Sequence, residues 1–474
     1  MIITVVFVRK EAGYKGTMKE AKQNVQNMTS GNSLKQIILF FIPLLWGNLF
    51  QQVYSLVDSI IVGKGISDKA LAAVGATGTL NFLIFGFVIG MTRGFGIKFS
   101  QSFGKGDIAL LKAYINNAKK LSLFTGAIFT AICVLSLNWM LTFMSTPDDI
   151  YHDAYSYFIV ILWGIMITVA NNLEITILQS LGDSKTPLIA MIISSLTNIV
   201  LDFTLIMGLK VGVAGAAIAT VISQAVSLCI CFYKIKKLSI LGKDNDEEKI
   251  EDGKLKWELI AIGLPVALMN SVTAAGAMIL QYFVNLMGSS YVAAYSACMK
   301  FSGLFEQFGM SVGLSMMTFV GQNMGAGEYD RIRKGVRQGL MISTVINIPL
   351  VLAMIFIPDK LAMVFLSDAE TIGYCADFMP VLGACFLALG WLFVYRNSVQ
   401  GLGNTFVPML SGALEVIMRL SVGFTLGRAS FRGIAMSEVA AWIGAFVMLM
   451  ITYYVQIALK EKITREQYQQ KFAL

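Results

Sequence analysis

Long apolar stretches separated by short polar segments run along most of the chain, from about Leu39 to Leu459. Many of these stretches reach the roughly 20 residues that a helix needs to cross the hydrocarbon core of a bilayer. Breaks at glycine, proline and clustered charges divide the pattern into twelve predicted helices. Their approximate ranges are 35–63, 70–102, 110–138, 151–181, 187–207, 212–236, 257–287, 291–323, 331–357, 370–400, 408–428 and 432–459.

The second half of the chain repeats motifs of the first half. "QSFGKGD" (Gln101–Asp107) returns as "QNMGAGE" (Gln322–Glu328), and "QSLGDSKTP" (Gln179–Pro187) returns as "QGLGNTFVP" (Gln400–Pro408). Both pairs have the same offset of 221 in the numbering. A shared offset indicates that one six-helix unit has been duplicated.

Six helices are an even number, so both copies of the unit enter the membrane from the same side. Parallel repeats of this kind are typical of transporters that work by alternating access. We therefore predict an all-α integral membrane protein with twelve transmembrane helices in two pseudo-symmetric six-helix lobes. The predicted parts are an N-terminal tail (1–32), an N-lobe (33–240), a charged linker (241–256) and a C-lobe with a short tail (257–474). A scaffold or a channel is the alternative that duplication alone leaves open.

Lysine and arginine are distributed unequally between the two sets of predicted loops. Most lie in the tails, in the linker and after the second and eighth helices. The opposite loops hold only Lys64, Lys69, Lys210, Lys360, Arg428 and Arg432. Because basic loops stay on the cytoplasmic side, we predict a multi-pass protein of the plasma membrane with both termini in the cytoplasm.

Composition excludes several other classes of protein. The chain is 56% hydrophobic and 14% charged, which is a membrane protein's balance. Its net charge of +8 is not arranged as a basic face with aromatics, so we expect no nucleic-acid partner. Six cysteines without a CxxC pair and one histidine, His152, provide no disulfide framework, metal motif or catalytic motif. We predict neither an enzyme nor a cofactor other than a coupling ion.

Four polar residues are predicted at similar depth in the first half. Asp58 and Asp202 each lie roughly 8 Å from the outer end of a helix, and Thr220 lies roughly 12 Å from the outer end of the next one. Asn198 stands four residues before Asp202, so both side chains share one helix face.

A carboxylate inside a bilayer costs several kcal/mol unless it is paired, protonated or bound to a cation. No lysine or arginine of the first half is predicted at this depth. Carboxylate, amide and hydroxyl oxygens suit Na⁺, and repulsion between neighbouring carboxylates favours protonation of one of them. We therefore predict a site for a coupling Na⁺ or H⁺. The alternative is that these groups merely hydrogen-bond between helices, which is the simpler interpretation for Thr220.

The motifs also resemble a known family. "FIPLLWGNLFQQVYSLVDSIIVG" in the first helix, "LAAVGA" in the second, the following "GKGD" loop and "LQSLGDSKTP" are similar to the multidrug and toxic compound extrusion (MATE) family over about residues 33–460. The resemblance implies two lobes in a V that export amphipathic organic cations and drugs in exchange for Na⁺ or H⁺. It implies a monomer whose partners are its small-molecule substrates and the lipid bilayer.

Within that family, the DinF-like branch has its ion site in the N-lobe. Asp58, Asn198, Asp202 and Thr220 match that branch's pattern, and Asn172 in the fourth helix fits the same network. The NorM-like branch uses acidic residues of the seventh and tenth helices. Here the seventh helix has no acid, and the tenth has only Asp377 near its outer end.

Other charges inside the predicted helices have two interpretations each. Glu174 is either a substrate-binding carboxylate or the partner of a basic residue such as Arg93. In the second half, a structural ion-pair network is predicted for Lys300, Glu306, Arg396, Glu415, Arg419 and Glu438. The alternative assigns Lys300, Arg396 and Arg419 to anionic cargo, which would make the protein a flippase for lipid-linked oligosaccharides.

Overall fold

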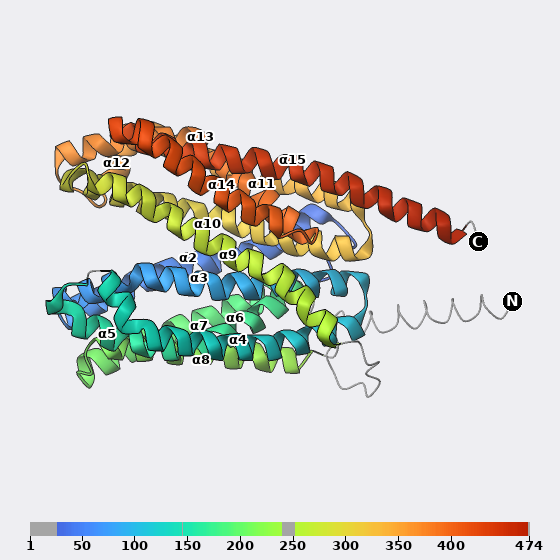
Figure 1. Cartoon of the computed structure of the whole chain (residues 1–474), viewed down its shortest axis with the longest axis horizontal. Coiled ribbons are helices and arrows are strands. Elements are labelled where there is room, and N and C mark those ends of the chain that lie inside the picture. Colours follow the sequence, from blue (N-terminus) through green and yellow to red (C-terminus); the bar gives the residue numbers. More distant parts are fainter. Residues whose placement is uncertain (1–25, 145, 239–251, 473–474) are drawn as a thin grey trace.

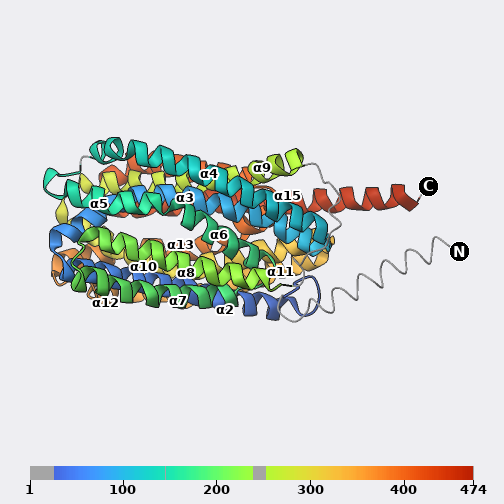
Figure 2. The same ribbon diagram turned by 90° about the horizontal axis from the view of Figure 1, so that it is seen from below.

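The structure is a computed structural model that describes residues 26–144, 146–238 and 252–472. Residues 1–25 of the predicted N-terminal tail, 241–251 of the predicted linker and the last two residues of the C-terminal tail lie outside the described residues. Figures 1 and 2 show long helices that run side by side along the longest axis, with α15 extending beyond the others. We call the end of the assembly where α2 begins and α15 ends the terminal end.

The described residues are almost entirely helical. The α-helices are α2 (Ser33–Gly65), α3 (Asp68–Lys105), α4 (Ile108–Phe143), α5 (Asp148–Trp163), α6 (Ile165–Ser180), α7 (Lys185–Asp202), α8 (Val213–Lys236), α9 (Asp252–Asn285), α10 (Ser289–Ala326), α11 (Tyr329–Phe356), α12 (Pro358–Ala362), α13 (Ala369–Gly401), α14 (Phe406–Val422) and α15 (Phe431–Phe472). Short π-helical segments, η2 (Phe203–Gly208) and η4 (Gly423–Gly427), extend α7 and α14.

Ten helices are long and apolar enough to cross a membrane, and α5 with α6 makes an eleventh span bent by 47°. The remaining predicted helix, 291–323, corresponds to α10, which has 38 residues but is not among these candidate spans. The predicted helix 151–181 is divided at Gly164, where an added Cβ would lie 2.5 Å from a methyl group of Val221 on α8. The chain is thus a multi-pass membrane protein. Among the described residues its one bent span bends at Gly164, where α8 packs closely against it.

The repeated loop motifs have the same geometry in both halves. Gly182 and Gly403, which the offset of 221 relates, have φ angles of +86° and +91°, a backbone conformation that glycine adopts without steric cost. The side chain of the next residue, Asp183 or Asn404, accepts a hydrogen bond from the main-chain N–H three residues later, at 2.9 and 3.1 Å. These bonds start α7 and α14, so the sequence repeat is also a structural repeat.

The helices form two groups, which we call the first bundle (α2–α8 with η2) and the second bundle (α9–α15 with η4). Figure 1 shows α10–α15 in the upper group, α4–α8 in the lower group, and α2, α3 and α9 between them. Phe378 and Phe386 belong to the buried core of the second bundle, whereas Phe158 and Phe99 belong to two separate clusters of the first.

The first helix of each bundle packs against the other bundle. On α3, Gly90 and Gly94 face α9 so closely that an added Cβ would lie 2.8 Å from the Cα of Ala267 and 2.6 Å from that of Gly263. Small residues at this spacing allow two helices to approach each other inside a membrane. In the reciprocal contact, the amide of Asn48 on α2 donates to the hydroxyl of Ser311 on α10, at 2.9 Å. The bundles are therefore interlocked.

Candidate ion site in the first bundle

Asp58 on α2 and Asp202 at the end of α7 bring their carboxyl groups close enough to interact electrostatically with each other. Asp202 is completely buried and Asp58 is half-buried. The backbone changes from α-helix to π-helix directly after Asp202. Such π turns are frequent at functional sites, although η4 shows that this one is also part of the repeated frame.

Asn198 lies one turn before Asp202 on the same face of α7 and is 1% exposed. Apart from the contact between the two carboxyl groups, several atoms have no hydrogen-bond partner among the described residues. They are both oxygens of Asp202, Oδ1 of Asp58, and both polar side-chain atoms of Asn198. A buried polar atom without a partner costs about 1–3 kcal/mol. This group of atoms fits a protein that binds a proton, a cation or its water there.

Two tyrosines lie near this acidic pair and were not predicted. Tyr54 is one turn before Asp58 on α2, and Tyr157 on α5 is 6% exposed. Both phenol groups lie close enough to interact electrostatically with Asp58 and Asp202. The i, i+4 spacing from Tyr54 to Asp58 was a usable signal in the sequence. Nothing in the sequence indicated which face of α5 meets the acids.

Thr220 and Asn172 are less closely associated with the acids. Thr220 is half-buried on α8, and its hydroxyl forms no hydrogen bond within the described part of the chain. The amide of Asn172 donates to the carbonyl of Thr168, one turn earlier in α6, at 2.9 Å. The structure therefore brings together Asp58, Asp202 and Asn198, but it does not hydrogen-bond Thr220 or Asn172 to them.

Glu174 on α6 is buried and forms an ion pair with Lys119 on α4, at 3.1 Å. The Nζ of Lys119 also lies 5.6 Å from the ring centre of Phe232. The predicted ion pair therefore exists, but Arg93 was the wrong partner. Arg93 is on α3, and depth alone could not distinguish these two cations.

Four charges of the second bundle form a buried network of ion pairs. Arg419 donates to Glu438 through Nη2 at 2.8 Å and through Nε at 3.1 Å, and its Nη1 lies 3.5 Å from Glu415. Arg396 forms an ion pair with the other oxygen of Glu415. All four residues are at most 7% exposed, and their charges cancel. The predicted network is confirmed for these four residues.

The other two charges assigned to that network have different contacts. Glu306 accepts a hydrogen bond from Ser302 at 3.0 Å. Lys300 is exposed, and its Nζ lies 5.0 Å from the ring centre of Phe365. Neither forms an ion pair with the four network residues, so the prediction was wrong for Glu306 and Lys300.

The sequence repeat shows which residues of the second bundle stand where the first has its polar group. By the offset of 221, Arg419 corresponds to Asn198 and Gly423 to Asp202. With the offset of 222 that relates Pro43 to Pro265, Asp58 corresponds to Leu280. The second bundle thus has a permanent guanidinium where the first has an amide, and it lacks both acids. Only the first bundle keeps an acidic pair without a cation among the described residues.

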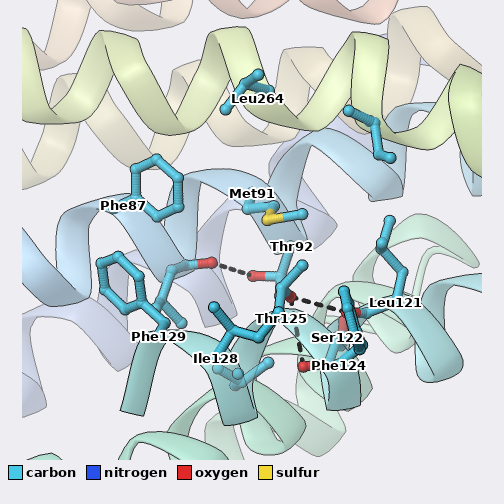
Figure 3. Close-up of a pocket in the computed structure, with 14 residues that line it drawn as sticks. Phe87, Met91, Thr92, Leu121, Ser122, Phe124, Thr125, Ile128, Phe129 and Leu264 are labelled. Carbon is cyan, nitrogen blue, oxygen red and sulfur yellow. Dashed lines mark hydrogen bonds between the residues drawn. The ribbon is translucent and has the colours of Figure 1, made fainter. Parts of the chain in front are cut away.

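A cavity of about 350 Å³ lies between α3, α4 and α9. Figure 3 shows that Phe87, Met91, Phe129 and Leu264 contribute to its mostly apolar lining. The hydroxyl of Thr92 donates to carbonyls of its own helix. This cavity contains none of the predicted site residues.

A family model named MatE matches the chain twice, over residues 43–204 and 265–425. The chain belongs to the MATE family. The two matches cover the same segment of each half, as duplication predicts. Family membership and the helical bundle together confirm the predicted fold class.

Curated MATE relatives span almost the whole chain. "Probable multidrug resistance protein YoeA" of Bacillus subtilis (strain 168) is 26% identical over 463 residues, which are 95% of this chain and 97% of that protein. "Probable multidrug resistance protein NorM" of Thermotoga maritima is 26% identical over 423 residues, 86% and 88% of the two chains.

Solved MATE structures have the same fold. A crystal structure of MATE in the bent conformation has a TM-score of 0.85 at 20% identity and covers 94% of this chain and 100% of its own. Identity this low shows the fold alone. The assignment to the DinF-like branch stays a prediction.

Proposed function

We propose that this MATE transporter is a cation-coupled antiporter that exports amphipathic, cationic organic compounds and drugs by alternating access. Na⁺ or H⁺ is the coupling ion, and Asp58, Asn198 and Asp202 bind it. Thr220 and Asn172 complete the network when the helices move. The observation that carries this proposal is the acidic pair of the half-buried Asp58 and the buried Asp202. Three of its four carboxyl oxygens and both polar side-chain atoms of Asn198 have no hydrogen-bond partner among the described residues.

The chemistry of coupling follows from that pair. Two close carboxyl groups repel each other when both are ionised, so the pair favours either a cation bound between the two carboxylates or a proton on one of them. An ion that binds one lobe arrangement better than the other shifts the balance between the two arrangements. Loading and release at Asp58 and Asp202 would therefore be linked to the direction in which the transporter opens.

The second bundle supports an ion site in the first bundle alone. Its equivalent positions carry Arg419, Gly423 and Leu280, so the guanidinium of Arg419 provides a permanent positive charge where the first bundle would bind a coupling ion. This arrangement favours the DinF-like assignment, with the ion site in the N-lobe (33–240) and a C-lobe (257–474) joined to it by the linker 241–256. Glu174 is the candidate carboxylate for a cationic substrate, once its bond to Lys119 opens.

Basic residues such as Lys105, Lys234, Arg333 and Lys462 lie at the terminal end. We therefore place this end, with both termini, on the cytoplasmic side of the plasma membrane. The names of the two curated relatives support drug-like substrates. We expect the monomer to be the transporting unit.

Transport into proteoliposomes with Na⁺ and pH gradients imposed separately tests the proposal. We expect one gradient to drive uptake of a fluorescent organic cation in the wild type. Asp58→Asn and Asp202→Asn should each lower the gradient-driven rate at least about tenfold, because each removes one charge of the pair. Asp377→Asn, an exposed acid of α13, is the matched control and should transport normally. A double variant of Asp58 and Asp202 with the wild-type rate would refute the coupling role.

The flippase alternative requires a cationic cavity for anionic cargo. Arg396 and Arg419 are neutralised by Glu415 and Glu438, which leaves only Lys300 of the three cations on which it rests. We therefore favour export of cations.

A further inference from the structure

The two copies of the repeated Gln-x-x-Gly motif meet at the terminal end, between the bundles. Gln101 on α3 donates its side-chain amide to the carbonyl of Gly401 at the end of α13, at 2.9 Å. Gln322 on α10 donates in the same way to the carbonyl of Ser180 at the end of α6, also at 2.9 Å. Both donors and both acceptors are related by the offset of the sequence repeat. One cross-bundle hydrogen bond is therefore made twice.

The glycines of the motif let the two main chains touch. An added Cβ at Gly104 would lie 1.8 Å from the carbonyl oxygen of Gln322, and one at Gly325 would lie 1.9 Å from that of Gln101. Neither distance leaves room for any side chain. The ends of α3 and α10 therefore close directly on each other, and the bundles cannot separate here without breaking both glutamine bonds.

The segment Gln26–Gly31 covers this junction and contacts both bundles. The N–H of Met28 donates to Oε1 of Gln322 at 2.8 Å, and the Met28 side chain is completely buried. Arg331 donates to the carbonyl of Met28 at 3.0 Å. On the first bundle, an added Cβ at Gly182 would lie 2.1 Å from the carbonyl oxygen of Gln26. The side-chain amide of Gln322 thus donates one hydrogen bond and accepts another, whereas that of Gln101 makes one cross-bundle hydrogen bond among the described residues.

We propose that Gln101 and Gln322 form a two-fold latch that holds the terminal end closed and sets the ratio of its closed and open states. This inference rests on the proposed alternating access. It assigns the repeated motif, which the ion site does not use, to positioning the bundles. Because these bonds exist only while the bundles touch, their loss lowers the population of the closed state without touching the ion or the substrate.

Electron–electron distance measurements on the full-length protein in nanodiscs test the latch. Spin labels at Lys236→Cys on α8 and Lys334→Cys on α11, both exposed near the terminal end, report the separation of the bundles. Cys229 and Cys385 are replaced by alanine in the background because they are not fully buried. Distances are recorded at pH 5 to 8, with and without Na⁺.

We expect Gln101→Met to lower the closed-to-open ratio about fivefold, the usual worth of one hydrogen bond. Gln322→Met should lower the ratio more, since this variant also loses the hydrogen bond that the N–H of Met28 donates to Gln322. Gln400→Met is the matched control, because this buried glutamine at the end of α13 contacts Met269 of its own bundle at 3.8 Å, and we expect no change. Should Gln322→Met fail to fold, Gln101→Met alone decides, because its side chain is only half-buried.

Two results would overturn the latch, and they separate it from the proposed function. Two distances in the wild type with an unchanged ratio in Gln101→Met would refute the latch but leave alternating access standing. One short distance under every condition, in the wild type and in Gln101→Met alike, would count against both.

Discussion

Replacing Glu438 by glutamine removes one negative charge from the second bundle's network with almost no change of shape. Arg419 then keeps a single ionic partner, Glu415, at 3.5 Å, and shares it with Arg396. At the 2.8 Å between Arg419 and Glu438, and with an effective dielectric constant of about 20, the lost attraction is about 6 kcal/mol. Relief of the carboxylate's own desolvation offsets part of it. We expect a net loss of about 3–5 kcal/mol in the free energy of unfolding.

The half-life of the folded, monodisperse protein on heating in detergent tests the direction of this effect, because unfolding of large membrane proteins is commonly irreversible and the half-life then reports the unfolding rate. We expect Glu438→Gln to shorten this half-life. Glu306→Gln is the matched control, since Glu306 forms no ion pair with the network and accepts a hydrogen bond from Ser302. We expect it to change stability by less than about 1 kcal/mol.

A double replacement separates charge from packing. Arg419→Met combined with Glu438→Leu removes both charges and leaves Arg396 paired with Glu415, so most of the lost stability should return. The reasoning fails if Glu438→Gln shortens the half-life no more than Glu306→Gln does. It fails equally if the double variant is no more stable than the single one.

Two further predictions concern packing and the ion pair of Glu174. Gly94→Ala should destabilise the protein by about 1–3 kcal/mol because the added Cβ would meet α9. Gly78→Ala, on the same helix, places its Cβ in open space and should be neutral or stabilising. Thermal denaturation of both variants tests this difference. Lys119→Met should cost about 2 kcal/mol or more by leaving the buried Glu174 without a cation. Glu174→Gln should cost less than about 1 kcal/mol because Lys119 is 37% exposed and can turn to water; equal melting temperatures would contradict this order.

The sequence predicted the helices well because crossing a bilayer requires about 20 apolar residues, a long and redundant signal. The predicted helix at 257–287, for example, corresponds to α9 at Asp252–Asn285. The bend at Gly164 was missed because a glycine inside an apolar stretch does not show whether another helix will press against it. That contact depends on Val221, which lies on α8, beyond the whole of α6 and α7 along the chain.

The acidic pair could be predicted for a similar reason. Depth follows from residue number once a helix is placed, and the face shared by Asn198 and Asp202 follows from helical periodicity. Rotation of one helix about its axis relative to another has no such signal in a single sequence. Tyr157 and the pairing of Glu174 with Lys119 depend on that rotation, so the structure was needed for both.

The contact between Asn48 and Ser311 also has a consequence for biosynthesis. These residues are separated by 263 positions, so a ribosome working at about 5–20 residues per second makes α10 roughly 13–50 s after the polar face of α2 has emerged. Until then the Asn48 amide needs another hydrogen-bond partner, such as a lipid headgroup, water or an insertion factor. Completion of α2's contacts is therefore a late, post-insertion step, and a chain truncated before α10 would present that unfinished helix to the cell's quality control.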